Sequence, residues 1–168
     1  MAELNGDRVV LRPLQVDDVP VLVEIQAQTS VARWWGRPEE EDLRRQAEGK
    51  SEETSFAITV DGAVAGLIQY VEESEPMYRH AGIDLFLSEE FQGRGLGTDA
   101  VRTLARHLVH DCGHHRLTID PSTDNHAAIR AYEKAGFRPV GVMRQYERSP
   151  EGDWRDGLLM DLLADELT

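Results

Sequence analysis

The sequence predicts a mixed α/β domain built around one sheet. Three observations predict this class: strand-like apolar runs and helix-periodic segments follow one another along the chain, an Asp-Gly pair marks a hairpin, and a glycine-rich loop separates a strand from a helix. The expected order is β-α-α-β-β-β-α-β-α-β-β. Because the sequence shows no repeats or linkers, residues 1–168 are expected to form a single domain.

The N-terminal part is expected to supply a strand, two helices and a hairpin. Residues 8–14 alternate in polarity and end near a proline, which is typical of a strand. Residues 17–28 begin with acidic capping residues, and residues 37–49 run from acids to bases in the order that a helix dipole favours. The stretch between them, RWWGR, is expected to be a loop. Two apolar runs flank Asp61-Gly62, a dipeptide typical of hairpin turns.

The C-terminal part is expected to alternate strands with helices. Residues 79–87 are apolar enough for a buried strand, and residues 115–121 predict a strand that stops at a proline. Helices are expected at residues 98–113 and 124–137, each with a glycine at or near its end. The chain is then expected to close with strands at residues 138–148 and 154–163.

Composition and charge narrow the class of function. The formal net charge is −13, and most of the excess lies in residues 1–75. Nucleic acids and anionic lipids are bound through basic clusters, so neither is expected as a partner; an acidic protein attracts cations, or is simply kept soluble by its charge. Cys112 is the only cysteine, and no histidine spacing indicates a metal site. Without an apolar span or signal-like stretch, a cytoplasmic protein is expected.

The loop at residues 92–97, QGRGLG, lies between a predicted strand and a predicted helix. Its glycines expose backbone N–H groups at the positive end of the helix and let a ligand approach closely, and Arg94 adds a positive charge. This arrangement predicts a phosphate or pyrophosphate site, the alternative being a tight turn without a ligand. The spacing fits neither the Walker loop nor the dinucleotide loop G-x-G-x-x-G.

Two motifs together resemble the GNAT N-acetyltransferase superfamily. QGRGLG matches its Q/R-x-x-G-x-G/A signature, and DNHAAIRAYEKAGF, at residues 124–137, is similar to its second hallmark. The resemblance covers nearly the whole chain. It implies a GNAT-like fold with splayed central strands and acetyl-CoA as co-substrate, with no metal.

The resemblance also implies where acetyl-CoA binds. Its thioester would enter a gap between the strand around residues 83–86 and the strand that ends at Asp120. Asn125 would bind the coenzyme A arm, and Tyr132 would protonate the leaving thiolate, the alternative for Tyr132 being a core aromatic. The implied cofactor residues are Phe86, Leu87, Gln92, Gly93, Arg94, Gly95, Leu96, Gly97, Thr98, Asn125, Ala128 and Tyr132.

Two carboxylates are expected beside this gap. Asp84 interrupts an apolar strand, and Asp120 ends the neighbouring one. Because an isolated carboxylate in apolar surroundings is costly, each needs a partner. Asp84 has Arg79, Arg116 or a backbone N–H group at a strand irregularity as candidate partners, and Asp120 has a turn; alternatively, both receive an ammonium substrate.

The stretches RWWG, GID and IDPSTDNHAAIRAYEKAGF resemble the aminoglycoside 6'-N-acetyltransferases of the superfamily. The likeness implies that Asp84 binds or deprotonates the reacting amine and that Asp120 binds a second ammonium group. A tryptophan would line the pocket, and an acidic loop would stand near it. The implied acceptor residues are Trp34, Trp35, Glu72, Glu73, Asp84 and Asp120.

The implied reaction is direct transfer to the 6'-amine of a polycationic antibiotic. Asp84, or a water it orients, would take the proton of the amine, and a backbone N–H near Leu85 would stabilise the oxyanion.

Residues 142–163 instead resemble ribosomal-protein alanine acetyltransferases, so a protein N-terminus stays open as the acceptor, as does a hydroxylysine siderophore precursor. A non-enzymatic acyl-CoA or aminoglycoside binding module is the other alternative. Antibiotic resistance and housekeeping both stay open as roles, and either a monomer or a homodimer is expected.

Overall fold

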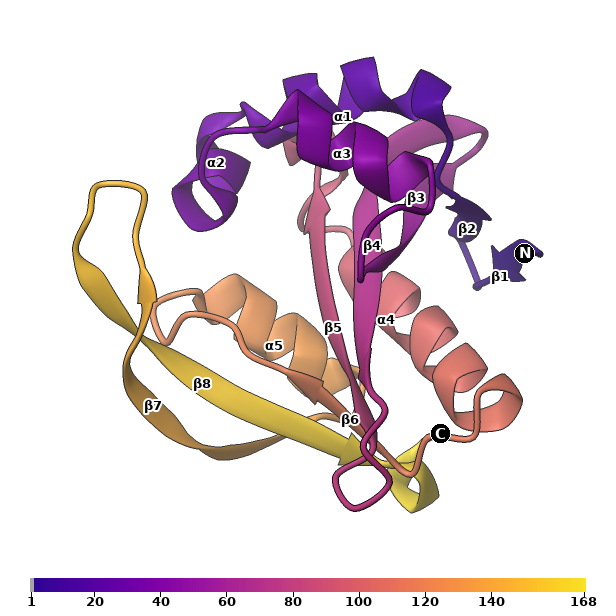
Figure 1. Ribbon diagram of the computed structural model, residues 1–168, viewed down its shortest axis with the longest axis vertical. Helices are drawn as coiled ribbons and strands as arrows, with labels where there is room; N and C mark the ends of the chain where they lie inside the picture. The colour runs from indigo at the N-terminus through magenta and orange to yellow at the C-terminus, as the bar shows by residue number, and fades with distance from the viewer. Residues whose placement is uncertain (1) are drawn as a thin grey trace.

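The computed structural model describes residues 2–168 and contains one mixed, eight-stranded sheet with helices on both faces (Figure 1). The strand order is β1-β2-β3-β4-β5-β6-β8-β7. Neighbouring strands are antiparallel except β5 and β6, which run parallel. The mixed α/β class predicted from the sequence is therefore confirmed.

The strands are β1 Leu4–Asn5, β2 Val10–Pro13, β3 Thr54–Val60, β4 Ala63–Glu73, β5 His80–Leu87, β6 Arg116–Ile119, β7 Arg138–Arg148 and β8 Trp154–Leu163. The α-helices are α1 Val19–Gln26, α2 Thr29–Trp35, α3 Glu40–Ala47, α4 Leu96–Arg106 and α5 His126–Lys134. Short helical turns occupy Val16–Asp18, Glu89–Phe91, His107–Asp111 and Ala164–Glu166. In the described part of the chain, no helix combines the length and apolarity needed to cross a membrane.

The helices and the hairpin lie where the sequence predicts them, with three differences. The tryptophan stretch is a helix, α2, and not a loop, because Val31 and Trp35 pack into the apolar layer beneath it. Strand β1 is too short to leave a periodic signal in the sequence. Helix α4 begins at Leu96, so Gly97 belongs to its first turn.

Two apolar layers hold the helices against the sheet. Helices α4 and α5 cover one face, and α1 and α3 cover the other (Figure 1). Side chains of a strand alternate between faces, so Ile83 and Leu85 join the first layer while Phe86 joins the second. Asp84 shares the Phe86 face of β5, and Figure 1 shows α2 at the end of that layer.

The central strands β5 and β6 separate along their length. They pair only where Ala81 faces Leu117 and Gly82 faces Thr118, whereas β5 stays paired with β4 as far as Leu87. Past Gly82 the β6 side of β5 therefore lacks a strand partner. This gap confirms the splayed strands that the resemblance implied, and it opens beside Asp84.

Candidate active site

A cavity of about 410 Å³ lies between the glycine loop, α2, β5 and α5. All the residues expected to bind the cofactor line it, with the exception of Arg94. The guanidinium of Arg94 lies over the ring of Phe91, 5.5 Å from its centroid, and its side chain is exposed. The structure thus brings the two sequence motifs to one cavity and leaves Arg94 outside it.

The glycine loop has the backbone that an anion site needs. Gly93 and Gly95 have φ values of 73° and 76°, in the left-handed region that favours glycine. Gly95 precedes α4, and its carbonyl accepts from the N–H of Asp99 at 3.1 Å. The N–H groups of the first turn before Asp99 have no partner within the helix, and their residues line the cavity.

The N-terminal segment fixes this loop from behind. The carboxylate of Asp99 accepts backbone N–H groups from Asp7, Arg8 and Val9 at 3.0, 2.8 and 3.0 Å. The guanidinium of Arg8 donates to the carbonyl of Arg94 at 2.5 Å. Sequence reasoning missed these two roles, because they join residues about ninety positions apart along the chain, as long-range pairs in a compact domain do.

A second cavity of about 200 Å³ adjoins the first and contains the acidic side chains. Asp84, Asp120 and Glu147 line it, and no lysine or arginine is among its described lining residues. The residues that line both cavities are Trp34, Trp35, Leu85, Asn125 and Tyr132. A third cavity of about 210 Å³, on the side of Gln69 and Thr118, also has Asp84 and Asp120 in its wall.

Asp84 lies where these cavities meet. Its side chain is open to the cleft. Desolvation by the surrounding protein, together with the charge of Asp120, raises the pKa of Asp84 to about 7. The N–H of Leu85 donates to its carboxylate at 3.0 Å, which acts in the opposite direction. The candidate arginine partners are engaged elsewhere: Arg79 donates to backbone carbonyls, and Arg116 pairs with Asp161.

Asp120 stands across the cleft at the end of β6. The hydroxyl of Tyr146, on β7, donates to its carboxylate at 2.5 Å. Burial raises the pKa of Asp120, and this hydrogen bond lowers it. The same hydrogen bond, together with burial and nearby carboxylates, raises the pKa of Tyr146 to about 12.

Tyr132 and Asn125 lie on or next to α5, in the walls of both the first and the second cavity. Tyr132 is buried, and desolvation with the charges of Asp84 and Asp120 raises the pKa of its hydroxyl well above the ordinary value, so it is protonated at neutral pH. The side chain of Asn125 caps the helix by accepting the N–H of Ala128 at 3.3 Å. Tyr132 therefore packs in the apolar core and also lines both cavities.

The tryptophans of α2 form a wall shared by both cavities. The indole N–H of Trp35 donates to the carbonyl of Leu85 at 3.2 Å, and its ring packs edge-on to Phe86. The ring of Trp34 lies between two guanidinium groups, those of Arg33 at 4.5 Å and Arg155 at 5.2 Å from its centroid. Both indoles are half-buried and line the second cavity as well as the first.

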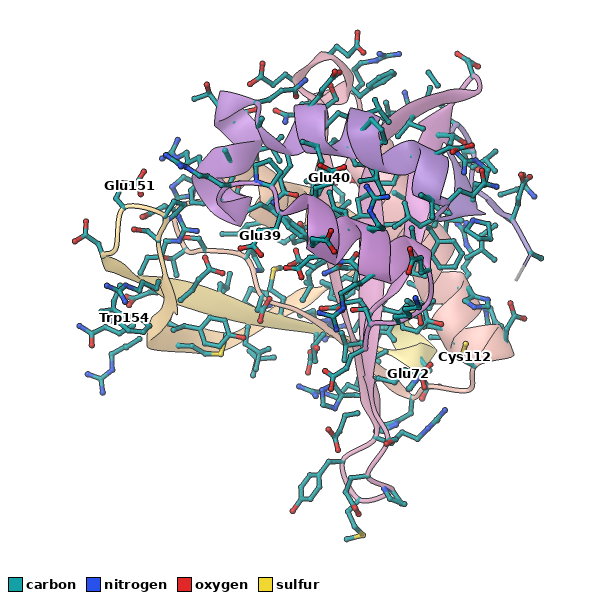
Figure 2. The ribbon with its side chains drawn as sticks, turned by 45° about the horizontal axis from the view of Figure 1, so that its top comes forward. Glu39, Glu40, Glu72, Cys112, Glu151 and Trp154 are labelled. Carbon is teal, nitrogen blue, oxygen red and sulfur yellow. The ribbon has the colours of Figure 1, made fainter. Side chains whose placement is uncertain are left out.

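Glu72 and Glu73 lie outside the cavities, contrary to expectation. The Glu72 carboxylate is 3.5 Å from the ring of His114, and Figure 2 shows it near Cys112, far from the β7–β8 hairpin that carries Trp154. Glu73 accepts the N–H of Glu75 in the adjacent loop. The physical reason is the alternation of β4, which turns Glu72 to the sheet face opposite Gln69.

Glu147 on β7 is the acidic lining residue that sequence reasoning missed. Its segment departs from the aminoglycoside acetyltransferase pattern, and an acidic residue in an exposed strand carries no signal of its own. Within residues 2–168, no group of three or more His, Cys, Asp or Glu side chains is arranged to hold a metal ion.

The fold, the glycine loop and the split strands are those of a GNAT-type acetyltransferase, and the comparison with known families gives the same class. Residues 8–138 match the model of the acetyltransferase (GNAT) domain. The chain therefore belongs to the GNAT acetyltransferase family, and it is a GNAT N-acetyltransferase.

Two of the relatives are acetyltransferases named for an aminoglycoside and for spermidine. The chain is 33% identical over 159 residues to the aminoglycoside N(6')-acetyltransferase type 1 of Klebsiella pneumoniae, covering 83% of this chain and 78% of that protein. It is 28% identical over 162 residues to the spermidine N(1)-acetyltransferase of Escherichia coli K12, covering 93% and 86%. The solved structure of aminoglycoside acetyltransferase AAC(6')-Ib with coenzyme A and kanamycin superimposes with a TM-score of 0.77 at 28% identity, over 94% of this chain and 96% of that one.

Proposed function

We propose that this protein transfers the acetyl group of acetyl-CoA directly to the 6'-amine of an aminoglycoside. The observation that carries the proposal is the acceptor cavity, in which Asp84, Asp120 and Glu147 meet the wall of Tyr132 with no basic side chain among the described lining residues. Carboxylates crowded in this way attract ammonium groups and form charge-assisted hydrogen bonds with them.

The donor cavity fits acetyl-CoA. The unpartnered N–H groups at the start of α4 suit a pyrophosphate, and the left-handed backbone of Gly93 and Gly95 lets the loop turn its N–H groups toward it. We assign the remaining implied residues, from Phe86 and Leu87 to Asn125 and Ala128, to contacts along the coenzyme A arm. Relatives solved with coenzyme A support this assignment.

Asp84 is the general base in this proposal. A carboxylate with a pKa of about 7 is half ionised near neutral pH and matches the proton transfer better than an ordinary aspartate does. It takes the proton of the acceptor amine directly or through one water. Asp120 binds a further ammonium group of the same acceptor, whereas Glu147 lies 2.7 Å from the guanidinium of Arg155.

Tyr132 is the general acid. Its raised pKa keeps the hydroxyl protonated, and its place in both cavity walls puts that proton between donor and acceptor. The N–H of Leu85 faces the gap left by the splayed strands, where it donates to Asp84 in this structure. We assign it to the oxygen of the acyl group.

A linear polyamine such as spermidine is the second candidate acceptor. The E. coli relative is a spermidine N(1)-acetyltransferase that matches over 93% of this chain, and the same three carboxylates suit its ammonium groups. A protein N-terminus fits less well, because its single ammonium would use only one of the carboxylates that line the cavity. The hydroxylysine acceptor has the same shortcoming.

The test is turnover of purified protein with acetyl-CoA and a panel of kanamycin, tobramycin, spermidine and an alanine-initiated peptide. Release of free thiol with the aminoglycosides, and NMR of the product showing acetylation at the 6'-amine, is the expected result. Turnover of spermidine and of no aminoglycoside would identify a linear polyamine as the acceptor. Tight binding without thiol release would indicate a binding module, and release with the peptide alone would overturn the polycation assignment.

A further inference from the structure

The side chain of Tyr146 extends from β7 to Asp120, a residue that lines the acceptor cavity. Its hydroxyl lies 2.5 Å from Oδ2 of Asp120, a residue 26 positions earlier in the chain. Tyr146 itself is 46% exposed and is not a lining residue of the cavity. Its contact with the site therefore runs through Asp120.

The backbone of β7 is distorted to make this contact. The register between β7 and β8 shifts between Met143 and Glu147, and Gln145 has a φ of 49°, which is unusual for a residue other than glycine. The N–H of Gln145 donates to the carboxylate of Asp156 at 2.8 Å, which holds the bulge. Conformations of this kind cost energy and persist where surrounding contacts maintain them, and they cluster at functional sites.

Gly157 on β8 makes room for the ring. A Cβ at this position would lie 2.7 Å from Cδ2 of Tyr146 and 3.3 Å from Cγ, so the aromatic ring occupies the space that a side chain would take. The bulge at Gln145, the missing side chain at Gly157 and the hydroxyl contact to Asp120 thus form one continuous arrangement. The hydroxyl contacts Oδ2 of Asp120, and Asp120 lines the cavity.

We propose that Tyr146 is a positioning residue that fixes the Asp120 carboxylate as the receptor for an ammonium group remote from the reacting amine. The inference rests on the proposed function and deepens it by assigning acceptor selection to the β7–β8 hairpin. A free carboxylate in a cleft samples several rotamers, and holding one oxygen orients the other. Glu147, the next residue, lines the same cavity, so the hairpin contributes one side chain to the cavity wall and a second that acts through Asp120.

The selectivity that follows depends on the number of charges in the acceptor. An acceptor with several ammonium groups pairs with Asp120 as well as with the base Asp84. A monoamine uses Asp84 alone and is indifferent to Tyr146. Loss of the tyrosine hydroxyl is therefore expected to weaken the binding of polyamines and to leave monoamine turnover unchanged.

The test is Tyr146→Phe, which removes the hydroxyl and keeps the ring over Gly157. KM for kanamycin or spermidine, and Kd from calorimetry, are expected to rise about tenfold, the range of one hydrogen bond to a charged group, while kcat changes less than about twofold. KM for acetyl-CoA and turnover of a simple monoamine are expected to stay unchanged. Tyr78→Phe, in the exposed β4–β5 loop, is the matched control.

A double-mutant cycle separates positioning from general structural support. In an Asp120→Asn background, Tyr146→Phe is expected to have no further effect on the acceptor KM, whereas a structural contribution would add. An unchanged acceptor KM in Tyr146→Phe, when the wild type turns over polyamines, overturns the inference alone. A wild type that neither binds nor acetylates any polycation overturns the proposed function, and the inference with it.

Discussion

The guanidinium of Arg155 on β8 lies 2.7 Å from the carboxylate of Glu147 on β7. The same group donates to the backbone carbonyls of Arg33 and Trp34 at 3.0 and 2.9 Å, and it lies over the Trp34 ring. One largely buried cation thus joins the β7–β8 hairpin to the carboxyl end of α2, whose tip Figure 1 shows close to the hairpin loop. The acceptor cavity takes its shape from this junction, because Trp34 and Glu147 both line it.

Arg155→Met is expected to loosen this junction. The change removes hydrogen bonds to two carbonyls and leaves Glu147 without its cation, so a loss of about 1–3 kcal/mol in the free energy of unfolding is expected. Thermal melting checks the stability, and the KM for the acceptor is expected to rise as α2 moves. Arg144→Met, an exposed residue of the same hairpin, serves as the control. Equal melting temperatures and equal KM values for the two variants would contradict the assignment.

Asp84→Asn is expected to reduce kcat by about 10²- to 10³-fold, because an amide cannot accept the proton of the amine. The change conserves shape, so binding of acetyl-CoA is expected to be retained. Steady-state kinetics with the best acceptor of the panel measure the effect. Asp165→Asn, at an exposed position near the C-terminus, is the control. A kcat within threefold of the wild type would exclude Asp84 as the base.

The pH dependence follows from the raised pKa of Asp84, about 7 in place of 3.8. Below pH 7 the carboxyl holds a proton, so kcat/KM is expected to fall about tenfold per pH unit and to level off above the pKa. For stability the sign is opposite to that of a paired aspartate: the folded state retains the proton between pH 4 and 7, so this group lowers the free energy of unfolding as pH rises through that window. The acid limb in kcat/KM and this pH dependence of the melting temperature are both expected to vanish in Asp84→Asn.

Tyr132→Phe is expected to lower kcat by about 10- to 10²-fold through loss of the proton that the departing thiolate receives. The phenyl ring fills the same buried volume, so the KM for acetyl-CoA and the melting temperature are expected to change little. Thiol release under saturating substrates measures kcat. A proportional fall in stability and in affinity for acetyl-CoA would show instead that Tyr132 acts only as a core aromatic.

Gly95→Ala is expected to raise the KM for acetyl-CoA about tenfold, because a Cβ adds strain at a φ of 76° and meets the Arg8 guanidinium at 2.7 Å. The matched control is Gly49→Ala, since Gly49 has the same left-handed backbone, with a φ of 72°, has nothing within 4 Å of a Cβ, and does not line the cavity. Acceptor KM values are expected to be unaffected by either change. Identical donor kinetics for the two variants would argue against a tight loop at Gly95.

Local patterns in the sequence predict most of the element order, apart from α2 and β1, and they predict the glycine-loop site. The loop QGRGLG and the segment from Asn125 to Tyr132 each carry their information within a few residues: glycines for the left-handed backbone, an asparagine cap, and helical spacing that brings Tyr132 to the side of the helix facing the gap. Contacts of this kind are short in sequence, so they are visible before the chain is folded. The confirmed mixed α/β class follows from such patterns, whereas the splayed strands were expected only from the family resemblance.

The acceptor site is different, because only the pairing of distant strands creates it. Glu147 and Tyr146 occupy an exposed strand with an ordinary polarity pattern, and they come to Asp120 because β7 pairs with β8, β8 pairs with β6, and a bulge at Gln145 rotates one side chain. Strand alternation likewise turned Glu72 away, although its charge alone made it as good a candidate. The sequence by itself predicted the family and the glycine-loop site; the tertiary structure decided which carboxylates line the second cavity, since register and twist are properties of the whole sheet.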